Sequence, residues 1–147
     1  MSSRESEVIM IVDDSDTDAH LFRTALEEAN IINPLIHCSS YDDAVQYLTG
    51  WGKYSDRKAY PFPLILFLDI YMPGKTGFDL LDWLRENETT KRLVVIMMSG
   101  SASQTDISQS YARGANSYLL KPNSREELVK LLQHFRVFWI ELNQYAF

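Results

Sequence analysis

The chain alternates between short apolar runs and longer amphipathic stretches. The apolar runs have the length and continuity of strands that are covered on both faces of a parallel sheet. They span Val8–Val12, Leu35–Cys38, Leu64–Leu68, Leu93–Met98 and Ser117–Leu120. Helical repeats lie between them, and four begin with a serine followed three residues later by an acidic residue, which is an N-terminal capping signal: Ser15 and Asp18, Ser40 and Asp43, Ser103 and Asp106, Ser124 and Glu127. With a further helix at Gly77–Glu86, the pattern predicts a flavodoxin-like α/β fold, a doubly wound (βα)5 sandwich with a five-stranded parallel sheet.

Two segments are longer than a minimal sandwich requires. Residues 49–63 are punctuated by glycine and proline, and we expect a loop with its own local packing. The last helix carries one apolar stripe, formed by Leu128, Leu131, Leu132, Phe135, Trp139 and Leu142. Residues 1–147 are therefore predicted to form one domain with a C-terminal helix that extends beyond about residue 136.

The end of that helix has more apolar residues than one face can bury. Val137, Phe138, Trp139 and Ile140 are consecutive, and neighbours on a helix point about 100° apart. The favoured interpretation is a homodimer interface. The alternative is that the tail folds back on the long loop around Trp51 and Tyr60.

Charge and composition exclude several classes of protein. The 147 residues carry a formal net charge of −6 and no basic run, whereas nucleic-acid binding requires clustered lysine and arginine. The single cysteine, Cys38, cannot form an internal disulfide, so a cytoplasmic location is expected. Neither an apolar leader nor an apolar run of about 20 residues is present, and no membrane partner is predicted.

Polar residues suited to phosphoryl transfer follow four of the predicted strands. Asp13 and Asp14 follow the first strand, Asp69 the third, Ser99 the fourth and Lys121 the fifth. The carboxyl ends of parallel strands meet at one edge of a sheet, where converging carboxylates repel each other unless a cation neutralises them. Oxygen ligands suit Mg²⁺, with Mn²⁺ or Ca²⁺ as substitutes, and an ammonium and a hydroxyl can hold a phosphoryl group. Each residue alone could be a helix cap or turn former, but the combination favours a phosphoryl site with a cation.

These residues stand in motifs that resemble those of receiver domains in two-component response regulators. The motifs are IVDDSD, LFLDIYMPGKTG, MMSG and SYLLKP, and the resemblance extends from Val8 to about Arg136. It implies that Asp69 accepts a phosphoryl group from a sensor histidine kinase. It also implies that Asp13, Asp14, Asp69 and the backbone carbonyl of Tyr71 hold the metal, and that Lys121 contacts the phosphoryl group.

The same resemblance implies a conformational switch. The Ser99 hydroxyl moves toward the phosphoryl group, Tyr118 turns inward, and the surface of the fourth helix, fifth strand and fifth helix changes its contacts with a downstream protein. It further implies a cis Lys121–Pro122 peptide bond. Beyond Mg²⁺-dependent self-phosphorylation and self-dephosphorylation, no enzyme activity is expected.

A narrower resemblance is to phytochrome-associated response regulators, which are single-domain and often dimeric. It rests on the long loop, the GANSYLLKP run and the pair Phe138–Trp139, and it implies a bacterial phytochrome as the kinase. Tyr71 and Ser99 depart from the small amide and the threonine that are common at these positions.

An unphosphorylated pseudo-receiver that only binds partners stays open as an alternative. A phosphatase with an aspartyl nucleophile is disfavoured, because Asp18 stands where its D-x-D-x-[TV] pattern requires threonine or valine.

Overall fold

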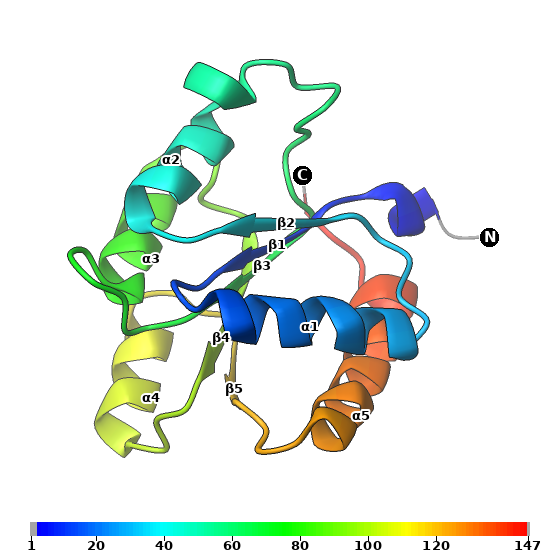
Figure 1. Ribbon diagram of the computed structural model, residues 1–147. Coiled ribbons are helices and arrows are strands. Elements are labelled where there is room, and N and C mark those ends of the chain that lie inside the picture. Colours follow the sequence, from blue (N-terminus) through cyan, green and yellow to red (C-terminus); the bar gives the residue numbers. More distant parts are fainter. Residues whose placement is uncertain (1–2, 147) are drawn as a thin grey trace.

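Five parallel strands form a single sheet in the order β2-β1-β3-β4-β5 (Figure 1). The computed structural model describes residues 3–146. The strands are β1 (Ile9–Val12), β2 (Leu35–Cys38), β3 (Ile65–Leu68), β4 (Val94–Ser99) and β5 (Ser117–Leu120). The helices are α1 (Asp16–Glu28), α2 (Tyr41–Thr49), α3 (Gly77–Glu86), α4 (Gln104–Ala112) and α5 (Arg125–Phe135). The predicted doubly wound fold is confirmed.

Helices cover both faces of the sheet, and each face has its own apolar core (Figure 1). On one face, α1 and α5 pack side by side over Phe67 of β3, whose ring contacts Phe22 at a centroid distance of 4.8 Å and Phe135 at 5.0 Å. On the other face, α2 and α3 enclose buried residues such as Leu66 and Leu81. All four residues of β1 and of β3 are buried, as expected for central strands. The carboxyl ends of these two strands therefore lie at the middle of the carboxyl edge of the sheet.

Side-chain caps fix where the helices begin. In α1, α2, α4 and α5 the four predicted serines accept hydrogen bonds from the backbone N–H three residues later. The α3 helix begins with a reciprocal capping box between Thr76 and Asp79, which the sequence analysis did not identify. Each of the helices therefore starts at a defined residue just beyond the carboxyl end of a strand.

The long connection between α2 and β3 has the local packing that was expected. The rings of Tyr54 and Tyr60 pack edge to face at 5.2 Å, and Tyr47 lies 5.0 Å from Tyr54. The Tyr47 hydroxyl donates to the Pro61 carbonyl at 2.6 Å. Trp51, in contrast, is exposed.

The C-terminal tail differs from the predicted continuous α-helix. Arg136–Leu142 form a π-helix, whose i→i+5 spacing moves the inward position to Ile140, five residues after Phe135. Ile140 is buried in the core under α1 and α5, so its assignment to a dimer interface is wrong, and Leu142, predicted to face inward, is exposed. The alternative of a tail folded on Trp51 and Tyr60 is also wrong, because Tyr60 packs on the opposite face of the sheet.

No helix within residues 3–146 combines the length and apolarity needed to cross a bilayer.

Candidate phosphoryl and metal site

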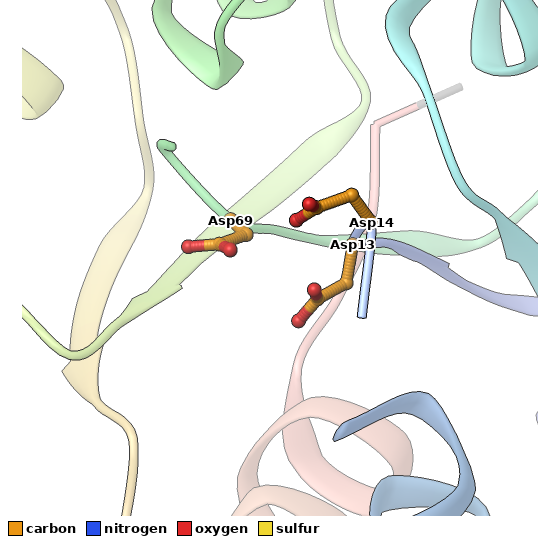
Figure 2. A group of neighbouring side chains, drawn as sticks. All are labelled: Asp13, Asp14 and Asp69. Carbon is orange, nitrogen blue, oxygen red and sulfur yellow. The ribbon is translucent and has the colours of Figure 1, made fainter. Parts of the chain in front are cut away.

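Three carboxylates gather at the carboxyl ends of β1 and β3. Asp13 and Asp14 follow β1, Asp69 follows β3, and one oxygen of each lies within 4.8 Å of the others (Figure 2). The backbone joins the two strand ends directly, because the Asp69 amide donates to the Val12 carbonyl at 3.0 Å. The predicted convergence of the carboxylates is therefore observed.

Asp13 is the most enclosed of the three. Its residue is 3% exposed, and its Oδ1 accepts a hydrogen bond from the Ser15 amide at 2.9 Å. Its backbone carbonyl contacts His37 Nε2 at 2.7 Å. These contacts, together with the hydrogen bond that the Asp13 amide donates to the Cys38 carbonyl, fix Asp13 in one position. Asp14 is exposed at the mouth of the cluster.

The Asp69 carboxyl is in an environment that disfavours its charged form. Burial raises its pKa above the ordinary value, the Lys121 ammonium opposes this rise, and the negative charge of Asp13 adds to it. The Asp69 side chain is nevertheless 12% exposed, so a small molecule can reach it.

Lys121 supplies the positive charge of the site. Its Nζ lies 2.9 Å from Asp13 Oδ2, 2.9 Å from Asp18 Oδ2 and 3.4 Å from Asp69 Oδ2. Burial by itself lowers the pKa of this ammonium, but the hydrogen bonds to Asp18 and Asp13 and the nearby negative charges raise it on balance, so it stays charged. The predicted cis Lys121–Pro122 bond is wrong, since no peptide bond within residues 3–146 is cis. The trans form is the intrinsically favoured isomer, and Lys121 reaches all three carboxylates with it.

The proposed switch residues lie on the β4 and β5 side of the site. Ser99 is buried, and its carbonyl accepts from the Lys121 amide at 2.8 Å, which joins the ends of the two strands. Its Oγ accepts from the Ser101 amide at 3.2 Å. The half-buried Tyr118 donates its hydroxyl to the Ser101 carbonyl at 2.7 Å. Both residues are thus tied to the β4–α4 loop at Ser101.

That loop is also tied to Tyr71, two residues after Asp69. The Tyr71 hydroxyl and Ser101 Oγ both donate to Asp106 Oδ2 at 2.7 Å. The hydrogen bond to Asp106 raises the pKa of the Tyr71 hydroxyl, and slight desolvation adds to the rise. The role of the Tyr71 carbonyl as a metal ligand stays a prediction.

Sequence reasoning missed the parts played by Asp18 and Asp106. Both were interpreted only as capping or first-turn carboxylates, because that function explains an acidic residue at such a position. A helical side chain, however, points back toward the N-terminus of its helix. Since the helices begin at the sheet edge, this rule could have indicated that both carboxylates face the site.

The residues fit a divalent cation. Four carboxylates meet one ammonium at the site, which leaves an excess of three negative charges. The carboxylates are those of Asp13, Asp14, Asp18 and Asp69, and the ammonium is that of Lys121. All the donors are oxygens, the preferred ligands of hard cations such as Mg²⁺. Asp14 is exposed, and no hydrogen bond from another described residue engages its carboxylate, which leaves it available to a metal ion.

The fold and site define an α/β domain with an acidic, lysine-containing site at the carboxyl edge of its sheet, as in phosphoryl-accepting signalling domains. The chain belongs to the response regulator receiver domain family, whose model matches residues 9–133. It is therefore a response regulator of the two-component type, as the motifs indicated.

The relatives are response regulators, and the names of two of them refer to phytochrome or red light. Response regulator Rcp1 of Synechocystis is 30% identical over 95% of this chain and 92% of its own. The structure of RPA3017, a response regulator in red light signalling of R. palustris, has a TM-score of 0.91 at 29% identity, over 96% of this chain and 99% of its own. The phosphorylated cyanobacterial phytochrome response regulator RcpA has a TM-score of 0.87 at 25% identity, over 97% of this chain and 99% of its own. The Mn²⁺-bound form of Rcp1 has a TM-score of 0.83 at 29% identity, over 96% and 99% of the two chains.

Proposed function

We propose that the protein is a Mg²⁺-dependent response regulator that accepts a phosphoryl group on Asp69 from a sensor histidine kinase. The observation that carries the proposal is that the Asp69 carboxylate lies beside those of Asp13 and Asp14 and 3.4 Å from the Lys121 ammonium. In this arrangement Asp69 is reachable from solvent, with the Lys121 ammonium beside it and two carboxylates that would hold a neutralising cation.

The transfer needs little from the protein beyond position and charge. An Asp69 carboxylate oxygen forms a bond to phosphorus as the phosphorus–nitrogen bond of a phosphohistidine breaks. The imidazole leaves with the electron pair of that bond. Lys121 then contacts a phosphoryl oxygen, and the Ser99 hydroxyl donates to another. A Mg²⁺ ion held by Asp13, Asp14 and Asp69 would neutralise the charge on the transferred group.

The switch follows from the contacts of the β4–α4 loop. Movement of Ser99 toward the phosphoryl group would pull on Ser101, whose carbonyl holds the Tyr118 hydroxyl. Tyr118 would then turn inward and alter the surface of α4, β5 and α5. A downstream protein target reads that surface.

The names of two relatives support a phytochrome as the kinase, since RPA3017 is described in red light signalling and RcpA as a phytochrome response regulator. The exposed Val137 and Phe138, with the half-exposed Trp139, are the residues we propose for a homodimer interface. A cytoplasmic location stays a prediction from the sequence.

A phosphorylation assay tests the proposal. The protein is incubated with Mg²⁺ and acetyl phosphate, and the product is an acid-stable, base-labile adduct. The adduct should disappear in Asp69→Asn and persist in the control Asp16→Asn, which removes an exposed carboxylate outside the cluster. Failure to form an adduct with either acetyl phosphate or the cognate kinase would favour the pseudo-receiver.

A further inference from the structure

The Lys121 ammonium has a carboxylate partner outside the Asp13, Asp14 and Asp69 cluster. Asp18, on the first turn of α1, contacts Nζ at 2.9 Å, which equals the Asp13 distance and is shorter than the 3.4 Å to Asp69. An ammonium has three protons to donate. In this state Asp13, Asp18 and Asp69 accept all three protons, and Asp69 has the longest contact.

The position of Asp18 is set by the helix and not by the ion pair. The Asp18 amide donates to Ser15 Oγ at 3.1 Å, which fixes the first turn of α1. One turn later the buried Phe22 packs α1 onto the sheet. The backbone of Asp18 is thus held at the edge of the site whether or not Lys121 contacts its carboxylate.

The contacts of Lys121 differ in how readily they can be exchanged. The Asp13 side chain is 4% exposed, so water cannot replace its bond to Lys121. The Asp18 side chain is 43% exposed, so water can take the place of the ammonium at small cost. When a phosphoryl group on Asp69 draws the ammonium toward its oxygens, the Asp18 contact is the one that gives way.

We infer that Asp18 is a positioning residue that holds the Lys121 ammonium back from the phosphoryl position until Asp69 is modified. This inference rests on the proposed function. Asp18, on α1, thereby sets the affinity of the site for a phosphoryl group. Asp18 competes with the phosphoryl oxygens for one proton of Lys121, so removing its carboxylate favours the phosphoryl-bound state.

The test measures binding of a phosphoryl analogue, trifluoroberyllate, at saturating Mg²⁺ by the change in tryptophan fluorescence. Asp18→Asn should bind it about 2- to 5-fold more tightly than the wild-type chain, the range expected from a partly exposed ion pair. The control is Asp16→Asn, which makes the same charge change on the same helical turn without a contact to Lys121. Asp18→Glu should restore an affinity close to that of the wild type, because it returns the competing carboxylate.

The variants are expected to fold, because the cap uses the backbone amide of residue 18 and not its side chain. Thermal unfolding checks this separately. Equal affinities in Asp18→Asn and Asp16→Asn, or weaker binding in Asp18→Asn, would overturn the inference while leaving the proposed function intact. Failure of the wild-type chain to bind the analogue with Mg²⁺ would overturn both.

Discussion

Gly77 is the residue whose replacement should disturb the phosphoacceptor most directly. It is the first residue of α3, and a Cβ built on it lies 2.1 Å from the Asp69 carbonyl oxygen and 2.9 Å from Ile70 Cα. Real Cβ atoms essentially never approach closer than 3.0 Å. In Gly77→Ala the two segments must therefore separate by 3.0 minus 2.1, or 0.9 Å, at the residue that carries the acceptor carboxylate.

No side-chain rotation can relieve the clash, because the new Cβ meets backbone atoms of Asp69 and Ile70. The Gly77 amide donates to the Ile70 carbonyl at 2.6 Å, and separation of the segments weakens that bond. Overpacking costs about 1–3 kcal/mol, and the weakened hydrogen bond adds about 1 kcal/mol. Reduced freedom of the unfolded chain returns up to about 1 kcal/mol. The net expectation is a loss of about 1–4 kcal/mol, or a drop in Tm of about 2–16 °C at this chain length.

Thermal unfolding by circular dichroism measures the loss, and phosphorylation by acetyl phosphate measures the displacement of Asp69. Gly100→Ala is the matched control, since a Cβ at Gly100 meets nothing within 4 Å and its φ is ordinary. Both quantities should fall in Gly77→Ala and stay near wild type in Gly100→Ala. Equal Tm values for the two variants would refute the reasoning from the close contact.

Three further predictions concern the site and the tail. Asp69→Asn should raise Tm at pH 7 without divalent cations. The folded-state pKa of Asp69 is raised, so the charged carboxylate lowers the stability of the folded state above that pKa. The increase in Tm should therefore shrink as the pH falls through the folded-state pKa. An unchanged Tm at pH 7 would contradict this. Tyr71→Phe should lower the midpoint of denaturant unfolding slightly by removing the bond to Asp106. Tyr111→Phe, at a tyrosine that is also exposed, should leave the midpoint unchanged, and equal effects of the two substitutions would argue against the bond. Ile140→Ala should cost about 2–4 kcal/mol as a core truncation, while Phe138→Ala should leave Tm unchanged and shift light scattering from dimer to monomer; a wild-type monomer at high concentration would remove the dimer proposal.

Most of the fold could be predicted because its signals are local. The predicted Leu35–Cys38 and Ser117–Leu120 agree with β2 and β5 residue for residue, although both are half-buried edge strands. The serine caps could be identified because one side chain and one amide, three residues apart, decide the helix start. The Thr76 cap was not predicted, although Thr76 and Asp79 have the same three-residue spacing as the serine caps.

The tail could not be predicted because an apolar stripe assumes 3.6 residues per turn. A π-helix shifts every later position, so the same sequence buries Ile140 and exposes Leu142. Nothing in the residues themselves marks that change of spacing. It appears only once Ile140 is seen to fill the core beneath α1 and α5.

The candidate site could be predicted only as far as strand topology determines it. Strand ends are fixed by the sheet, so Asp13, Asp69 and Lys121 were found together as expected. Asp18 and Asp106 reach the same edge from helix first turns, and their direction depends on how each helix leaves its strand. These two carboxylates connect the site to opposite faces of the sheet, Asp18 to the α1 and α5 layer and Asp106 to α4. Under the proposed function, a phosphoryl group on Asp69 would therefore act on both layers at once, through Lys121 on one side and through the Tyr71 and Ser101 contacts on the other.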